Sequence, residues 1–94
     1  MKILQIIYNL APGGAERFVV DMCNELTKDK NNEVCLLNIN ANTPKEQHYL
    51  PTLSKEVTYK NIGAPKGLCF KSITGVYKAI KEIKPDIVHL HCST

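Results

Sequence analysis

Apolar residues in this chain fall into short continuous runs that alternate with helical stripes. The first run covers residues 2–8 and is apolar on both faces except at Gln5, as in a central parallel strand that helices cover on both sides. After a glycine turn, apolar residues recur with helical spacing, which predicts an amphipathic helix. The stripe that we expect to face the core consists of Ala15, Phe18, Val19, Met22, Cys23 and Leu26.

Further strands and one more helix follow along the chain. We expect a second buried strand at residues 33–39 and a third, half-buried strand near the sheet edge at residues 57–62. Between them, residues 40–56 predict a loop with a helix start and one short helix that is broken near Pro51. A final strand is expected at residues 87–92.

The last helix precedes that final strand. Ser72 is a plausible N-cap, and Pro85 should end the helix. Its side chains again follow a helical period, which predicts one buried face. The residues of this face are Ile73, Val76, Tyr77, Ile80 and Ile83.

The order of elements predicts an α/β fold. Strand, helix, strand, a short helix, strand, helix and strand form a Rossmann-like half with a parallel sheet of about four strands in the order 3-2-1-4. Ligands of such sheets bind beyond the carboxyl ends of the strands, where the strand order reverses. That point lies between the first and fourth strands, and Gly13, Gly14 and His91 should lie there.

Length and composition narrow the class of protein. The 94 residues suit one small domain, and the net charge of +3 is too small and too scattered to indicate nucleic-acid binding. The four cysteines have no C-x-x-C spacing, which favours reduced thiols in a cytoplasmic protein over a disulfide framework or a zinc site. The amino-terminal run is too short to cross a membrane.

The turn after the first strand carries the candidate chemistry. Residues 9–17 read Asn-Leu-Ala-Pro-Gly-Gly-Ala-Glu-Arg. A strand, a glycine turn and a helix N-terminus can bind an anion, because first-turn N–H groups point outward and glycine permits close approach of a phosphate. The same pattern is compatible with a simple tight turn, so Gly13, Gly14 and Ala15 are candidate phosphate-binding residues.

Three common motifs are absent at this place. A dinucleotide site needs G-x-G-x-x-G and an acidic residue at the end of the second strand, where this chain has Asn38 and Asn40. No Gly-Lys-Ser/Thr follows the glycines, which excludes a Walker loop. No Gly-x-Ser-x-Gly is present, which excludes a hydrolase nucleophile elbow.

Polar residues near the turn and the last strand complete the candidates. We expect His89 and His91 on opposite faces of the sheet, so that they hold no shared metal, with His89 facing the core and bonded to backbone. His91, at the strand end, is either a site residue or a structural hydrogen-bonding group. Glu16 complements the helix dipole, and Arg17 either reaches a phosphate or faces solvent.

The motifs together resemble a known enzyme family. Residues 1–4, 12–17 and 84–91, the last reading Lys-Pro-Asp-Ile-Val-His-Leu-His, are similar to segments of the retaining family 4 glycosyltransferases of the GT-B fold. Members of that family have a Gly-Gly-Ala-Glu loop after the first strand and a later strand reading Pro-Asp-(Ile/Val)-(Ile/Val)-His-x-His. The resemblance covers almost all of this chain, but only roughly the first quarter of a typical member.

The resemblance implies transfer of a sugar from a nucleotide-sugar donor to a hydroxyl acceptor, with retention of configuration. The N-terminal domain of such enzymes mainly holds the acceptor, which can be a polysaccharide, a lipid or a small molecule. A C-terminal domain with a Glu-x7-Glu motif holds the donor. Gly13, Gly14 and Ala15 would then approach the donor diphosphate, while His91 and Glu16 would lie on the acceptor side. No metal or cofactor is implied.

Residues 1–94 are therefore expected to be a partial, acceptor-side domain that is inactive without its donor-binding domain. The strand at residues 86–92 is apolar on both faces, so we expect the piece to self-associate through an exposed edge. No transmembrane segment is expected, although peripheral contact with a membrane is compatible with the family. The alternative hypothesis is a stand-alone α/β module that binds a phosphorylated ligand or a partner protein.

Overall fold

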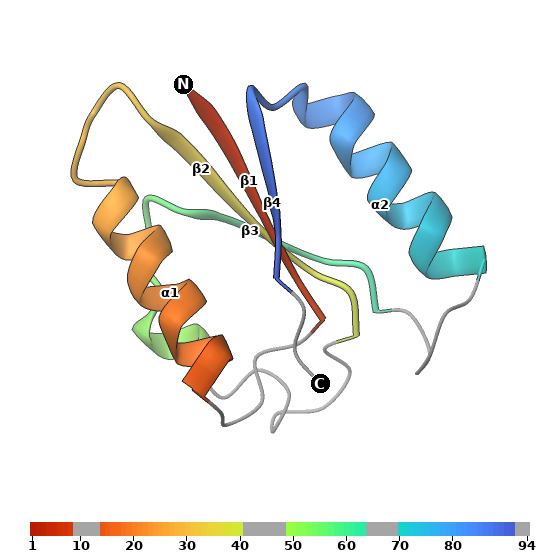
Figure 1. Ribbon diagram of the computed structural model, residues 1–94, viewed down its shortest axis with the longest axis horizontal. Coiled ribbons are helices and arrows are strands. Elements are labelled where there is room, and N and C mark those ends of the chain that lie inside the picture. The colour runs from red at the N-terminus through yellow and green to blue at the C-terminus, as the bar shows by residue number, and fades with distance from the viewer. Residues whose placement is uncertain (9–13, 41–48, 64–69, 92–94) are drawn as a thin grey trace.

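The structure is a computed structural model that describes residues 1–8, 14–40, 49–63 and 70–91. Within these ranges, strands and helices follow one another in the predicted order (Figure 1). The elements are β1 (Lys2–Ile7), α1 (Gly14–Leu26), β2 (Glu33–Asn38), the 3-10 helix η2 (Leu50–Thr52), β3 (Thr58–Asn61), α2 (Phe70–Ile83) and β4 (Ile87–Leu90).

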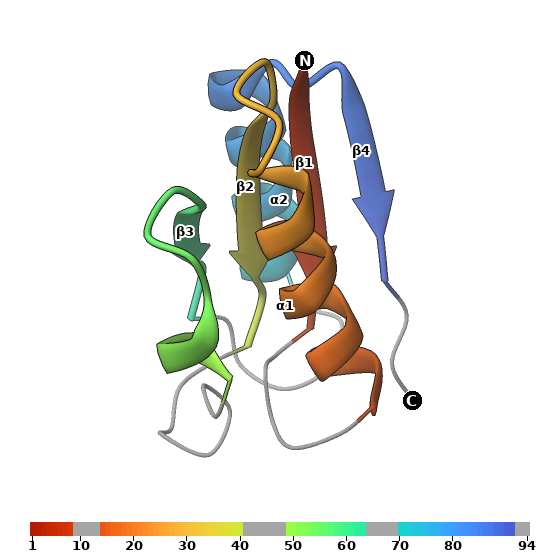
Figure 2. The same cartoon turned by 90° about the vertical axis from the view of Figure 1, so that its left-hand side faces the viewer.

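The four strands form one parallel sheet in the order β3-β2-β1-β4. This confirms the predicted Rossmann-like α/β fold and its strand order. Leu4 at the centre of β1 lies between Cys35 of β2 and Val88 of β4. Helix α1 covers one face of the sheet and α2 covers the other, while β4 forms one edge of the sheet, beyond α2 (Figures 1 and 2).

Each face of the sheet has its own apolar core. Successive side chains of a strand point to opposite faces, so β1 contributes to both cores, which explains why nearly all of its residues are apolar. The buried core under α1 contains Ile7, Val19, Val20, Cys23, Val34, Leu36 and Val57. The buried core under α2 contains Leu4, Ile6, Leu37 and Ala79.

The predicted buried stripe of α1 is wrong at Phe18. That side chain is 59% exposed, whereas Val20, which the stripe omitted, is only 1% exposed. Asn24, on one flank of the helix, contacts the segment before β3 through hydrogen bonds to Thr52 and Ser54. Phe18, six residues before Asn24, lies about 120° away around the helix and outside the buried face. The helix is therefore rotated so that Val20 replaces Phe18 in the core.

The predicted stripe of α2 is also wider than the buried face. Ala79 is buried, but Ile73 and Tyr77 are 55% and 64% exposed, and Ile80 is also exposed. The predicted N-cap is wrong too, because α2 begins at Phe70 and Ser72 lies within its first turn. The helix therefore begins three residues before residue 73, the first helical position that an N-cap at Ser72 would give.

The end of α2 is tied to the start of the sheet. Lys84 ends the helix in the left-handed region (φ 52°), and its N–H donates to the carbonyl of Ile80 at 2.9 Å. The Lys2 ammonium donates to the carbonyl of Ile83 at 3.2 Å, near the negative end of the helix dipole. Asp86 then accepts from the Lys2 backbone N–H at 2.7 Å, which fixes the entry of β4 beside β1. Among the described residues, no helix has the length and apolarity needed to cross a bilayer.

Candidate functional site

The strand order reverses between β1 and β4, and the candidate residues that the structure describes lie at the carboxyl end of these strands. Helix α1 begins at Gly14 at this end of the sheet, and His91 follows β4 at the same end (Figure 2). Gly13 lies outside the described residues, as does the side chain of Ala15. The fold thus brings Gly14 and His91 to the end of the sheet at which ligands of such folds bind.

The first turn of α1 presents backbone donors and one acidic side chain. An α-helix supplies no acceptor for its first four N–H groups, which here begin at Gly14. Glu16 lies in this turn and is partly buried. Arg17 faces solvent, with its side chain 74% exposed and its Nε 3.9 Å from the carboxylate of Asp21. Arg17 is therefore exposed beside the first turn of α1, and a contact between Arg17 and a phosphate stays a prediction.

A hydrogen bond to the central strand holds the imidazole of His91. Gln5 is the one interruption of the apolar run in β1 and is only 2% exposed. Its amide oxygen lies 2.5 Å from Nε2 of His91, while the His91 backbone N–H donates to Ile6 at 2.9 Å. Because an amide oxygen can only accept, this contact requires a proton on Nε2. The contact explains the buried glutamine and leaves Nδ1 as the second polar atom of the ring.

The expectation that His89 and His91 face opposite sides of the sheet is wrong. Residues two apart in a strand point to the same side, and the two ring centroids are 4.0 Å apart. His89 is also exposed rather than directed into the core. Burial, and secondarily the neighbouring His89, lowers the pKa of His91 below its usual 6.5. The two imidazoles therefore form a pair in which a second positive charge is disfavoured.

The lowered pKa of His91 predicts a loss of stability in acid. Between the lowered pKa and the ordinary value of 6.5, the unfolded chain binds more protons at this site than the folded chain. The free energy of unfolding should therefore fall as the pH drops through this window. Urea denaturation at several pH values would measure the fall, which should be smaller in His91→Gln. An unchanged pH slope in that variant would contradict the assignment.

At the carboxyl end of β2, the structure places an amide where a dinucleotide-binding fold has an acid. Asn38 is fully buried, and its Nδ2 donates to the Tyr59 hydroxyl at 2.8 Å. Its amide oxygen has no hydrogen-bond partner among the described residues. Burial raises the pKa of Tyr59, while the bond to Asn38 opposes this shift. An amide and a neutral phenol cannot supply the charge-assisted contact that a carboxylate makes to ribose hydroxyls.

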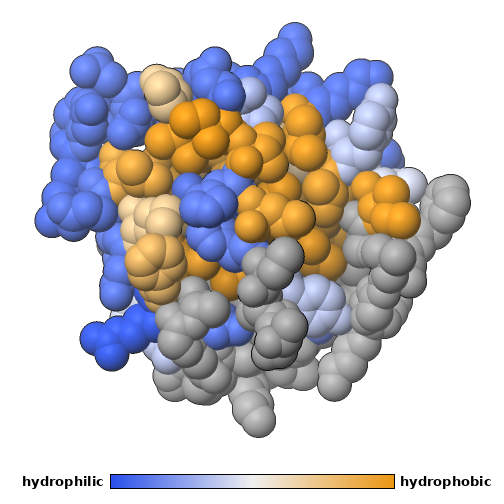
Figure 3. All heavy atoms as spheres, viewed as in Figure 1, coloured by the Kyte–Doolittle hydropathy of each residue, from blue (hydrophilic) through white to orange (hydrophobic). Residues whose placement is uncertain are grey.

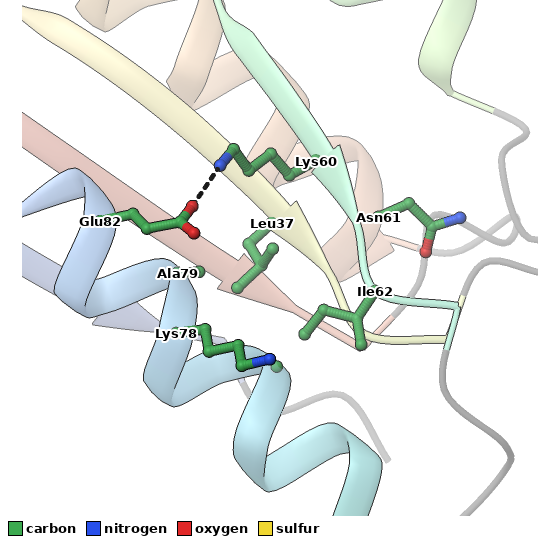
Figure 4. A pocket seen from close by; sticks show the side chains of 8 residues that line it. Leu37, Lys60, Asn61, Ile62, Lys78, Ala79 and Glu82 are labelled. Carbon is green, nitrogen blue, oxygen red and sulfur yellow. Dashed lines mark hydrogen bonds and ion pairs between the residues drawn. The ribbon is translucent and has the colours of Figure 1, made fainter.

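A shallow pocket of about 210 Å³ lies elsewhere, between α2 and the ends of β2 and β3 (Figure 4). Lys60 and Glu82 at its rim pair with each other at 3.3 Å, and Leu37, Ile62 and Ala79 supply apolar walls. None of the predicted site residues lines this pocket. Lys78 also lines the pocket, so a charged side chain is present there besides the Lys60–Glu82 pair.

Cysteine and metal chemistry have little support in the described part of the chain. Burial is the main factor that raises the pKa of the Cys23 thiol to about 12, so this thiol is not a nucleophile at neutral pH. Cys35 is partly buried and also free, while Cys69 and Cys92 lie outside the described residues. Within the described ranges, no group of three or more His, Cys, Asp or Glu side chains is placed to hold a metal.

The chain was also compared with known proteins. No protein-family model, no curated protein and no solved structure matches it. Assignment of a function therefore depends on the arrangement of residues at the carboxyl end of β1 and β4.

Proposed function

We propose that this chain belongs to the acceptor-side domain of a retaining glycosyltransferase, which transfers a sugar from a nucleotide-sugar donor to a hydroxyl acceptor. The observation that carries the proposal is the start of α1 at Gly14, at the carboxyl end of the central strand and beside the reversal of strand order. The Gly-Gly-Ala-Glu loop and the Pro-Asp-Ile-Val-His-Leu-His segment support the same family.

In this proposal, the turn before α1 binds the donor diphosphate. The first-turn N–H groups, which have no acceptor within the helix, and the positive end of the helix dipole favour a negatively charged ligand. Gly13 and Gly14 have no side chain, so a phosphate oxygen can reach the backbone, and Ala15 adds little bulk. The donor's nucleotide and sugar would be held mainly by a second domain, which makes residues 1–94 alone inactive.

The acceptor would lie against His91 and Glu16. With Nε2 of His91 bonded to Gln5, Nδ1 is the ring atom left to accept a hydrogen bond from an acceptor hydroxyl. The carboxylate of Glu16, in the first turn of α1, can accept from a second hydroxyl. Nucleotide sugar as the donor fits a cytoplasmic enzyme, and acceptors on a lipid would bring the enzyme to a membrane surface.

The reading frame that contains residues 1–94 provides the test. We expect it to encode a Glu-x7-Glu motif in a following domain. We also expect the purified product to release a nucleoside diphosphate from UDP- or GDP-sugars only when a hydroxyl acceptor is present. A stop codon directly after Thr94, together with a monomeric product that binds inorganic pyrophosphate, would instead favour a stand-alone phosphate-binding module.

A further inference from the structure

Strand β4 is an edge strand without the usual protection against further pairing. It ends the sheet, its four residues are all exposed, and none of them is acidic or basic apart from His89. Strand β3, at the other edge, carries Lys60, and charged side chains on an edge discourage pairing. The two edges therefore differ, and β4 is the one open to another strand.

The pairing of β4 with β1 determines which residues of β4 direct their backbone N–H and C=O groups away from β1. The N–H of His91 donates to the carbonyl of Ile6, and residues of a parallel strand alternate in the side to which their N–H and C=O groups point. Ile87 and His89 therefore share the orientation of His91, toward β1. Val88 and Leu90 direct their N–H and C=O groups away from the sheet, where no described strand pairs with them.

Apolar side chains continue on both sides of this edge. Val88 and Leu90 are opposite Leu4 and Ile6, so they lie on the α2 face, and the exposed flank of α2 adds Tyr77 and Ile80. On the α1 face, Ile87 is 46% exposed, and Phe18 of α1 is 59% exposed. Figure 3 shows apolar surface extending across this side of the molecule, broken by one polar group near its centre.

The extent of this surface suits a protein–protein contact. Large apolar side chains that are each about half exposed, six or seven in number, present on the order of 500 Å². Isolated monomers rarely expose more in one patch, and a specific interface needs about 800 Å² from each partner. The backbone edge of β4 and the flanking polar side chains add to this apolar area. The surface that each copy would bury then approaches the size of a specific interface.

We propose that the occupant is a second copy of this chain, whose β4 pairs antiparallel with the first across a twofold axis at His89. Val88 of each copy then exchanges backbone hydrogen bonds with Leu90 of the other, and a single eight-stranded sheet results. This proposal concerns the isolated chain of residues 1–94 and does not rest on the glycosyltransferase proposal.

A second copy fits the edge for two physical reasons. The axis makes the interface isologous, so each apolar patch covers an identical patch and the assembly closes at two copies. Strand β4 contains no Asp, Glu, Lys or Arg, so pairing two copies of it brings none of these charges together. The lysine on β3 disfavours the β3–β4 contacts that would otherwise extend the sheet into a polymer.

Sedimentation velocity at pH 8 with two matched lysine variants tests the proposal. We expect the unmodified chain to be a dimer at about 100 μM. Val88→Lys should be monomeric, because it places a charge at the centre of the interface. Thr58→Lys adds the same charge at the exposed start of β3 and should remain a dimer. Circular dichroism of both variants would confirm that each is folded.

Hydrogen exchange distinguishes strand pairing from unspecific association. The amide protons of Val88 and Leu90 should exchange at least tenfold more slowly at concentrations that favour the dimer than in dilute solution, because pairing buries them in a new ladder. The amide protons of β3 should not change. A monomer at 100 μM, a dimer that survives Val88→Lys, or unprotected Val88 and Leu90 amides in the dimer would each overturn the proposal.

Discussion

Replacement of Leu4 by alanine should lower the free energy of unfolding by about 3 kcal/mol, since deleting buried leucine atoms and leaving a cavity costs about 2–5 kcal/mol. Leu4 is 0% exposed and lies in the central strand, in the core formed with Ile6, Leu37 and Ala79. Both neighbouring strands and α2 meet at this position, so the surrounding residues have little freedom to fill the space. A domain of this size has a total stability of about 5–14 kcal/mol, so the loss would be a large share of the whole.

Urea denaturation followed by circular dichroism would measure this loss. Leu90→Ala is the matched control, because it deletes the same atoms from a side chain that is 61% exposed at the sheet edge. At concentrations too low for association, that control should cost less than about 1 kcal/mol. Equal losses in the two variants would contradict the assignment of Leu4 to the core.

In the glycosyltransferase that we propose, replacement of Gly14 by valine should reduce sugar transfer by about 100-fold or more, which is the scale of effect expected when reacting groups are displaced by about 1 Å. Gly14 is the first residue of α1, where a branched side chain would keep a phosphate away from the first-turn N–H groups. The helix itself tolerates valine in its first turn, so the fold should remain. Activity with saturating donor and acceptor, compared with thermal unfolding of the same samples, measures both effects.

Gly14→Ala supplies a graded control for this prediction. One methyl group obstructs the approach of a phosphate less than two branches do, so transfer should fall by a smaller factor than in Gly14→Val. Lost transfer accompanied by lost helix content would indicate a structural role for Gly14. Full transfer by a folded Gly14→Val enzyme would remove Gly14 from the proposed diphosphate site.

The contact between Gln5 and His91 is a feature of the site that the sequence did not predict. Gln5 was visible as the polar interruption of an apolar strand, and His91 was visible as a strand-end histidine. Their 2.5 Å contact joins residues 86 positions apart, and it depends on the pairing of β1 with β4. The periodicity of apolar residues describes only neighbours along the chain. It therefore cannot identify His91 as the partner of Gln5, and the structural role of Gln5 was not predicted.

The sequence alone determined the order of strands and helices, the parallel sheet in the order β3-β2-β1-β4 and the place of Gly14 at the start of α1. These features follow from local periodicity, from turn residues and from the handedness of strand–helix–strand units, all of which are encoded over short stretches. Only the tertiary structure decided which members of each apolar stripe are buried. Periodicity gives the apolar side of a helix, but it does not give the rotation at which the helix packs on the sheet. Val20 and Ala79 are therefore covered, while Phe18 and Tyr77 stay exposed.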